Sequence, residues 1–206
     1  MAASPQAPTQ AREQLLETAS RIMREDDTVD VSLSELSRRS GLNAALVKYY
    51  FGNKAGLMTA LLEREMERII KDLGDTLAIE RDPEDMLRAH ISGVIDRFFE
   101  VPYIQRLLLH MIEESPPEEA QRMADKYLKP IYDAYDRMIA AGVESGSFRP
   151  VDARFFFFTL TGAVDRFFAA RLFMRYCFGE DSLSEELRDK FRAHTVEFIM
   201  AGLEKR

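Results

Sequence analysis

The chain has 206 residues, 46% of them hydrophobic, and a formal net charge of −7. This length can bury one substantial core or two closely joined helical units. The sequence contains no run of 18 apolar residues, which argues against a transmembrane helix, and residues 1–10 lack the basic and apolar regions of a signal peptide. The single cysteine, Cys177, excludes an intramolecular disulfide and is typical of a reducing compartment, so we expect a cytoplasmic protein.

The charge is unevenly distributed along the chain. Residues 1–59 hold seven basic and seven acidic side chains, whereas residues 60–206 hold 21 basic and 28 acidic ones. Between residues 32 and 58, four basic side chains face a single acidic one, Glu35. A locally positive head on an acidic body favours docking on phosphate groups in one orientation.

Apolar residues recur at helical spacing along the chain, and no segment shows the sustained alternation of a strand. We therefore expect an all-α protein of about nine helices, preceded by a disordered arm over residues 1–9. The expected helices cover about residues 10–25, 33–40, 44–51, 54–77, 83–100, 102–113, 116–141, 153–178 and 183–203.

Small polar residues mark the boundaries of the first helices. Ser32 with Glu35 forms a capping box, in which the serine hydroxyl accepts the backbone amide of the glutamate. Gly41 permits a tight turn. Asn43 can cap the helix after that turn, and Asn53 can cap the long helix that follows.

Three further boundary signals lie in the second half of the chain. Pro130 cannot donate an amide hydrogen bond, so we expect a bend there. Residues 142–150 contain glycine and proline and are expected to form a loop. Ser182 with Glu185 makes a second capping box, which predicts the start of the last helix.

Two short helices joined at a glycine and followed by a longer helix have the form of a helix-turn-helix. The second short helix would be the recognition helix, whose N-terminal end and outer face meet bases and phosphates. Small side chains there would let the helix lie deep in the major groove and would place methyl groups against thymine. An ordinary helical hairpin is the alternative on spacing alone. The outward positions are Asn43, Ala44, Ala45, Lys48 and Tyr49.

The same segment resembles the TetR family of bacterial regulators. Residues 32–43, SLSELSRRSGLN, are similar to that family's second helix and turn. Residues 46–57, LVKYYFGNKAGL, are similar to its recognition helix running into its fourth helix. The strong match covers about residues 12–62, and residues 142–150, GVESGSFRP, resemble the family's loop before the last two helices. The resemblance implies DNA binding.

Three positions depart from the family pattern. Lys48 stands where members usually carry tyrosine, and Gly52 stands where many have proline or serine. The arm before the first helix carries only Arg12, where many relatives are richly basic.

Lys54 lies in the first turn of its helix, where free amides and the helix dipole favour an anion, and the resemblance also implies a phosphate clamp. A solvated surface lysine is the alternative. Ser32 can be a helix cap only, or its region can also touch phosphate. Arg38 and Arg39 are more often surface charges than contacts. The expected DNA-binding residues are therefore Ser32, Ser34, Asn43, Ala44, Ala45, Lys48, Tyr49 and Lys54.

The helix expected over residues 153–178 is apolar nearly all round, so it needs partners on two sides. We expect one side of this helix to pack on the core of its own chain and the other side to pack on a second subunit. The resemblance implies that the last two helices pair with their symmetry mates in a four-helix bundle.

A ligand site is expected among the helices of the body, because ligand pockets are mostly apolar with a few placed polar groups. The resemblance places effectors among the same helices, and the aromatic residues favour a small hydrophobic or aromatic molecule. A solid, well-filled core is the alternative. The candidate residues are Phe98, Phe99, Tyr103, Leu107, His110, Met111, Tyr132, Asp165, Arg166 and Phe167.

Enzymatic chemistry finds no support. The histidines His90, His110 and His194 lack metal-ligand spacing and are expected to be satisfied structural residues, and no phosphate-binding glycine loop or nucleophile elbow occurs. We therefore expect no cofactor and no metal.

The sequence predicts a homodimer with two parts. Residues 10–53 form a three-helix DNA-binding domain that recognises an inverted repeat in double-stranded DNA, and residues 54–206 form a helical ligand-binding and dimerisation domain. The expected function is that of a repressor released from its operator by a small molecule. A ligand-independent regulator and a helical protein-interaction module are the alternatives.

Overall fold

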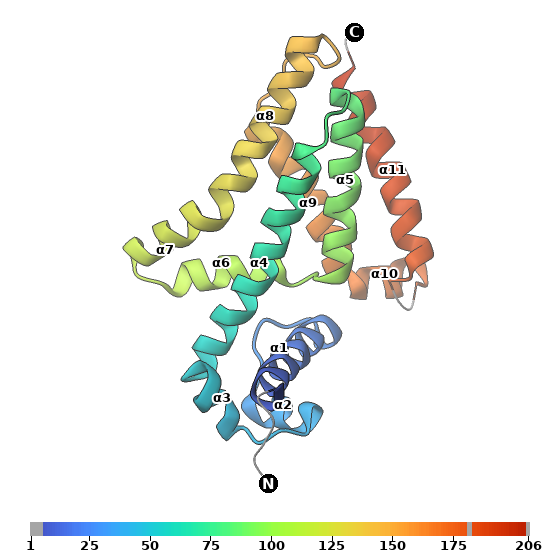
Figure 1. Cartoon of the computed structure of the whole chain (residues 1–206). Helices are drawn as coiled ribbons and strands as arrows, with labels where there is room; N and C mark the ends of the chain where they lie inside the picture. The colour runs from blue at the N-terminus through green and yellow to red at the C-terminus, as the bar shows by residue number, and fades with distance from the viewer. Residues whose placement is uncertain (1–5, 181–182, 205–206) are drawn as a thin grey trace. The chain divides into compact units, whose positions relative to one another are not determined.

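The computed structural model describes residues 6–180 and 183–204, and over these ranges it is helical, with no strand (Figure 1). The chain divides into two compact units. The first contains the residues up to 67 together with 103–109, and the second contains 68–102 and the residues from 110 onward. The expectation of an all-α chain is confirmed.

The first unit is built by α1 (Gln6–Asp26), α2 (Leu33–Ser40), α3 (Ala45–Phe51) and the beginning of α4 (Lys54–Ala78). The apolar stripe of α1 packs with single inward residues of the short helices, as helical periodicity requires. Its buried side chains include Leu15, Leu16, Ala19, Ile22, Met23, Leu36, Val47, Leu57, Leu61 and Leu62.

Helix α1 begins at Gln6, four residues before the position that the sequence predicts. The expectation of a disordered arm is therefore wrong for residues 6–9. Residues 1–5 of that arm lie outside the described residues.

The first unit also includes a segment distant in sequence, residues 103–109. The Tyr103 hydroxyl donates a hydrogen bond to Ser20 Oγ of α1 at 2.8 Å, and the Arg106 guanidinium pairs with Asp27 at 2.5 Å. Helix α6 (Ile104–Glu114) therefore carries residues of both units. The first unit also includes residues 54–67, which lie beyond the domain boundary at residue 53 that the sequence predicts.

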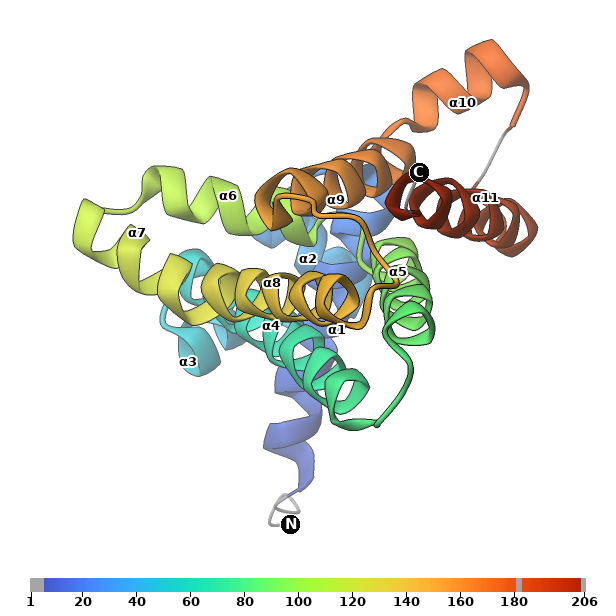
Figure 2. The same cartoon turned by 90° about the horizontal axis from the view of Figure 1, so that it is seen from above.

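The second unit contains α5 (Pro83–Glu100), α7 (Pro117–Met123), α8 (Lys129–Ser145), α9 (Ala153–Ala169), α10 (Arg171–Phe178) and α11 (Glu185–Leu203). Helices α5, α8, α9 and α11 run beside one another around one apolar core (Figures 1 and 2). The core includes Leu87, Ile91, Ile95, Phe98, Tyr135, Met138, Ile139, Phe148, Phe156, Leu160, Val164, Phe168, Met200 and Leu203.

The helix expected over residues 116–141 is interrupted where the proline predicted a disturbance. A π-helical turn, η1 (Ala124–Leu128), separates α7 from α8, and the Lys129 amide donates to the Ala124 carbonyl. Pro130 follows directly. Because proline has no amide to continue the regular ladder, a local change of hydrogen bonding is expected at this point.

The helix also continues beyond the predicted stop at Gly142 and ends at Ser145, with Gly146 in the left-handed conformation at φ 86°. Gly142 lies inside the helix, and the Phe148 ring packs where a side chain at this position would stand. A Cβ built on Gly142 would stand 1.9 Å from that ring. The expected loop is therefore four residues shorter at its start.

The expected helix over residues 153–178 is two helices, because the chain turns at Ala170 (φ −91°, ψ 30°). The last helix is capped by Ser184, whose Oγ accepts the Leu187 amide at 3.2 Å, whereas the sequence predicts Ser182 as the cap. Ser182 lies outside the described residues. Over the described ranges, no helix combines the length and the apolar character needed to cross a bilayer.

Candidate nucleic-acid interface

The turn between α2 and α3 forms as the sequence predicts. Ser32 Oγ accepts the Glu35 amide at 3.2 Å and caps α2. Gly41, at φ 71°, closes the helix, and its amide donates to the Ser37 carbonyl at 2.9 Å. Asn43 Oδ1 accepts the Ala45 amide at 2.8 Å and so begins α3. These local bonds fix the direction of α3 relative to α2.

The junction between α3 and α4 is equally tight. Gly52 adopts φ 77°, and Asn53 Oδ1 accepts the Gly56 amide at 2.8 Å. A Cβ on Gly56 would stand 2.0 Å from the Phe51 carbonyl oxygen. Only glycine therefore lets the end of α3 approach the first turn of α4 so closely, and this approach helps to fix the position of α3.

Two arginines of α2 are held in ion pairs within the unit. Arg38 and Arg39 both bond the Glu35 carboxylate, and these bonds lower the pKa of Glu35 to about 2. Arg39 also reaches back to α1, where it pairs with Glu25 at 2.9 Å and Asp26 at 2.6 Å. Arg39 thus ties α2 to the C-terminal end of α1.

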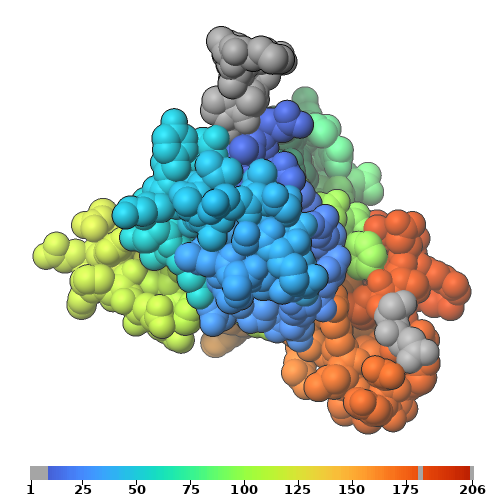
Figure 3. Space-filling model, turned by 90° about the horizontal axis from the view of Figure 1, so that it is seen from below, coloured from blue at the N-terminus to red at the C-terminus, as the bar shows by residue number. Residues whose placement is uncertain are grey.

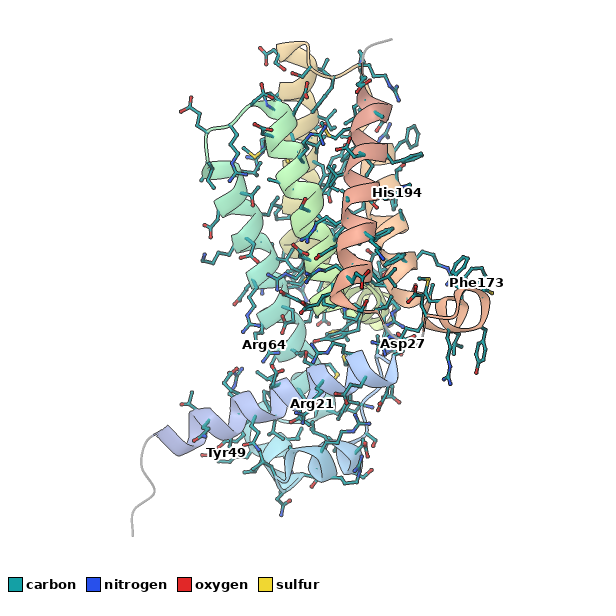
Figure 4. The ribbon with its side chains drawn as sticks, turned by 90° about the vertical axis from the view of Figure 1, so that its right-hand side faces the viewer. Arg21, Asp27, Tyr49, Arg64, Phe173 and His194 are labelled. Carbon is teal, nitrogen blue, oxygen red and sulfur yellow. The ribbon has the colours of Figure 1, made fainter. Side chains whose placement is uncertain are left out.

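Helix α3 buries one side and exposes the other. Val47 is buried, whereas Asn43, Ala45 and Lys48 are exposed and Ala44 is half-buried. Tyr49 is 75% exposed, and its ring stands edge-on to Tyr50 at 4.8 Å. The structure therefore brings all five expected recognition residues to one end and one face of this short helix. The surfaces of α2 and α3 are seen together in Figure 3, and Figure 4 labels Tyr49.

The expected phosphate-binding residues lie near the starts of helices. Ser32 and Ser34 are exposed, and their hydroxyl groups are 3.1 Å apart. Lys54 lies in the first turn of α4, but its ammonium pairs with the Asp30 carboxylate. Lys54 is therefore not simply a solvated surface lysine. A phosphate that binds to its ammonium group would have to replace the Asp30 carboxylate.

The expected ligand residues divide between the two units. Tyr103 and Leu107 are buried in the first unit. In the second unit, Phe98 belongs to the core and Phe99 packs against Phe168, at 6.0 Å between ring centroids. Phe167 stacks on Phe191 of α11 at 3.8 Å. Phe98, Phe99 and Phe167 therefore lie on α5 and α9, whereas Tyr132 lies on α8.

The remaining ligand candidates have mixed surroundings. His110 pairs with Glu114 at 3.6 Å, so a neighbouring carboxylate already faces its imidazole. Met111, Tyr132 and Asp165 are half-buried, and Arg166 is exposed. A groove along η1 and α8 contains none of the predicted ligand residues, and its lining consists mostly of charged side chains: Asp125, Lys129, Pro130, Asp133, Asp136 and Arg137.

The sequence assigns His90 only a structural role, and the structure places it in the core of the second unit, where it is 7% exposed. Its ring stands edge-on to Tyr135 at 4.7 Å, and its Nε2 has no hydrogen-bond partner among the described residues. Burial lowers the pKa of His90 to about 4, so the imidazole is neutral. The expectation of a satisfied structural histidine is therefore wrong at Nε2. The available signal was its position on the apolar face of α5, three residues after Leu87 and four before Val94.

Two family models match the chain. The model described as "Bacterial regulatory proteins, tetR family" matches residues 15–61, and "Tetracyclin repressor-like, C-terminal domain" matches residues 80–205. The first match covers the helix-turn-helix. The second covers more than half of the chain.

Curated relatives match the N-terminal part. The regulator "BetI 1" of Chromohalobacter salexigens is 33% identical over 91 residues, which are 42% of this chain and 43% of that protein. "BetI" of Stenotrophomonas maltophilia is 32% identical over 90 residues, or 41% of this chain and 44% of that protein. The matched region thus spans less than half the length of these relatives.

Solved structures share the fold along nearly the whole chain. A tetR-family protein from Rhodococcus RHA1 has a TM-score of 0.72 at 15% identity, with 95% of this chain and 98% of that chain covered. A putative transcriptional regulator from Saccharomonospora viridis, in complex with choline, has a TM-score of 0.70 at 18% identity, covering 96% and 100%. FadR from Bacillus subtilis, in complex with stearoyl-CoA, has a TM-score of 0.66 at 15% identity, covering 93% and 99%. Together with the family models, these likenesses show that the chain belongs to the TetR family, whose members are transcriptional regulators with a helix-turn-helix and are not enzymes.

Proposed function

We propose that this protein is a homodimeric regulator that reads an inverted repeat in double-stranded DNA with α3. The observation that carries the proposal is the exposed face of α3, where Lys48 and Tyr49 follow the small side chains of Ala44 and Ala45 by one turn on a helix fixed at both ends. Lys48 can reach bases or phosphates, and the alanine methyl groups permit close approach to the groove floor.

Selection of bound sequences from random duplex DNA tests this proposal. A two-fold dimer should select an inverted repeat whose half-sites lie about one helical turn, or a multiple of it, apart. The Lys48→Tyr variant should select a different half-site. A single unrepeated half-site for the wild type would contradict the dimeric docking proposal.

We propose that Lys54, Ser32 and Ser34 contact the DNA backbone. The pairing of Lys54 with Asp30 gives this part of the proposal a specific test. Asp30→Asn removes a competitor of phosphate and a negative charge, so it should strengthen binding to random and selected duplexes alike. Unchanged affinity would show that Lys54 does not bind phosphate.

We propose that α9 and α11 form the dimer interface. The supporting observation is that Phe155, Phe158 and Phe198 are 70–71% exposed on these two helices, which a stable monomer does not favour. Phe198→Glu should therefore yield monomers and abolish operator binding. Sedimentation at micromolar concentration measures this, and a wild type that sediments as a monomer contradicts the interface.

We propose further that a small, largely hydrophobic molecule releases the regulator from its operator. The unpartnered Nε2 of buried His90, among the aromatic side chains of the second unit, supports a neutral molecule with one polar group. The structural relatives in complex with choline and with stearoyl-CoA support this part of the proposal, because in both of them this fold holds a bound molecule. Such a ligand acts only through unequal affinity for two states of the protein.

Phenol, a neutral aromatic molecule with one hydroxyl group, is a direct probe of effector binding. An effector should raise the Tm and, by linkage, weaken operator affinity, and His90→Phe should reduce the response to an aromatic probe with a hydroxyl group. Stabilisation without operator release would leave a ligand-independent regulator as the better description.

A further inference from the structure

Helix α10 exposes most of its apolar side chains. It runs from Arg171 to Phe178 between the turn at Ala170 and Gly179, which adopts φ 72°. Met174 is its one buried residue. The exposed fractions of its large apolar side chains are 72% for Leu172, 52% for Phe173, 76% for Tyr176 and 65% for Phe178.

A short helix with exposed apolar side chains needs another surface that packs against it. Helices of fewer than about 12 residues are marginal in water unless tertiary packing stabilises them. Helix α10 has eight residues. It projects beyond α9 and α11 (Figures 2 and 4), and Figure 4 labels Phe173 on it. The described part of the chain therefore supplies little of the packing that this aromatic helix requires.

A second copy of the chain is the occupant that fits best. In the sequence, helix α10 lies between α9 and α11, the two helices that expose Phe155, Phe158 and Phe198. It therefore belongs to the same part of the chain as the proposed dimer interface.

The exposed area agrees with this assignment. Large aromatic side chains bury about 150–250 Å² each, so the three phenylalanines of α9 and α11 offer on the order of 400 Å². Helix α10 adds on the order of 500 Å² from Leu172, Phe173, Tyr176 and Phe178. A stable interface takes about 800 Å² from each partner, which the large apolar side chains reach only when α10 takes part.

We propose that α10 is a dimerisation arm whose aromatic face packs on the second subunit beside the interface of α9 and α11. This inference rests on the proposed homodimer.

The first test is the dimer dissociation constant of the full chain, measured by sedimentation over a dilution series. A variant with Leu172→Ser, Phe173→Ser and Tyr176→Ser should dissociate at least tenfold more readily than the wild type. Ile79→Ser is the matched control, because Ile79 is also an exposed apolar residue, at 47%, and lies outside the proposed interface. Its dissociation constant should equal that of the wild type.

The second test uses the unmodified protein and so does not depend on how the variant folds. Cys177 is exposed in the single chain and lies four residues after Phe173, on the same side of α10. Its reaction with a thiol reagent should be at least several-fold slower in the concentrated dimer than in the dissociated wild type at the dilute end of the series.

The outcomes distinguish a failure of the proposed dimerisation arm from a failure of the proposed homodimer. The three serine substitutions could leave the dimer dissociation constant unchanged, and Cys177 could react equally fast in the dimer and the monomer. These results together would contradict the proposed dimerisation arm but not the proposed homodimer. A wild type that is monomeric throughout the dilution series overturns the proposed homodimer, and the arm with it.

Discussion

Gly56→Ala should disrupt the junction that orients α3. The new Cβ would stand 2.0 Å from the Phe51 carbonyl oxygen, a full ångström inside the 3.0 Å limit of real Cβ contacts. The obstacle is backbone, so we expect the upper part of the overpacking range, about 3 kcal/mol. Alanine is favoured over glycine in a helix by about 1 kcal/mol, which offsets part of this cost. The net loss of unfolding free energy should be about 2 kcal/mol.

Gly74→Ala is the matched control. Gly74 lies on the same helix, α4, is exposed, and would place its new Cβ within 4 Å of nothing. The same substitution should therefore stabilise the protein by about 1 kcal/mol. The two variants differ in the sign of their effect because only one of them meets a neighbouring backbone atom.

Urea unfolding measures both effects, and operator titration measures the consequence for binding. Gly56→Ala should lower the urea midpoint and weaken operator binding, whereas Gly74→Ala should raise the midpoint and leave binding unchanged. If Gly56→Ala were as stable as Gly74→Ala and bound DNA like the wild type, the close approach of α3 and α4 would have no structural role.

Three other variants test the packing and electrostatics. Gly142→Ala forces the Phe148 ring to move and should lower stability by about 2 kcal/mol in urea unfolding. Because burial lowers the pKa of His90 from its ordinary value of 6.5 to about 4 in the folded protein, the unfolded chain takes up the proton first as the pH falls. Stability should therefore decrease from pH 6.5 towards 4, by roughly 3 kcal/mol from this residue, and His90→Phe should flatten that dependence. Arg39→Gln releases α1 from α2 and should lower the urea midpoint.

The boundaries that the sequence predicts well depend on contacts between neighbours in the chain. Ser32, Asn43 and Asn53 all accept backbone amides two or three residues ahead, and the chemistry of such caps is visible in the sequence alone. The recognition face of α3 follows from helical periodicity for the same reason.

Features that depend on tertiary packing escaped prediction. Gly142 was interpreted as the end of a helix, but its role is to accommodate Phe148, which reaches it only after the chain turns. The turn at Ala170 has no glycine or proline to mark it. The burial of His90 and the assignment of Tyr103 to the first unit also depend on neighbours from distant helices.

The central claim, that α3 binds DNA, is tested most directly by titrating a random duplex at two salt concentrations with wild type, Lys48→Ala and Lys71→Ala. Lys71 is an exposed lysine on α4 that pairs with Asp75, and it serves as the charge-matched control. The affinity of the wild type and of Lys71→Ala should fall steeply with salt, with a slope of about −0.9 per phosphate contact. Lys48→Ala should bind more weakly with a shallower slope. Salt-independent binding by the wild type, or equal slopes for all three proteins, would contradict the assignment of α3 as the DNA-binding helix.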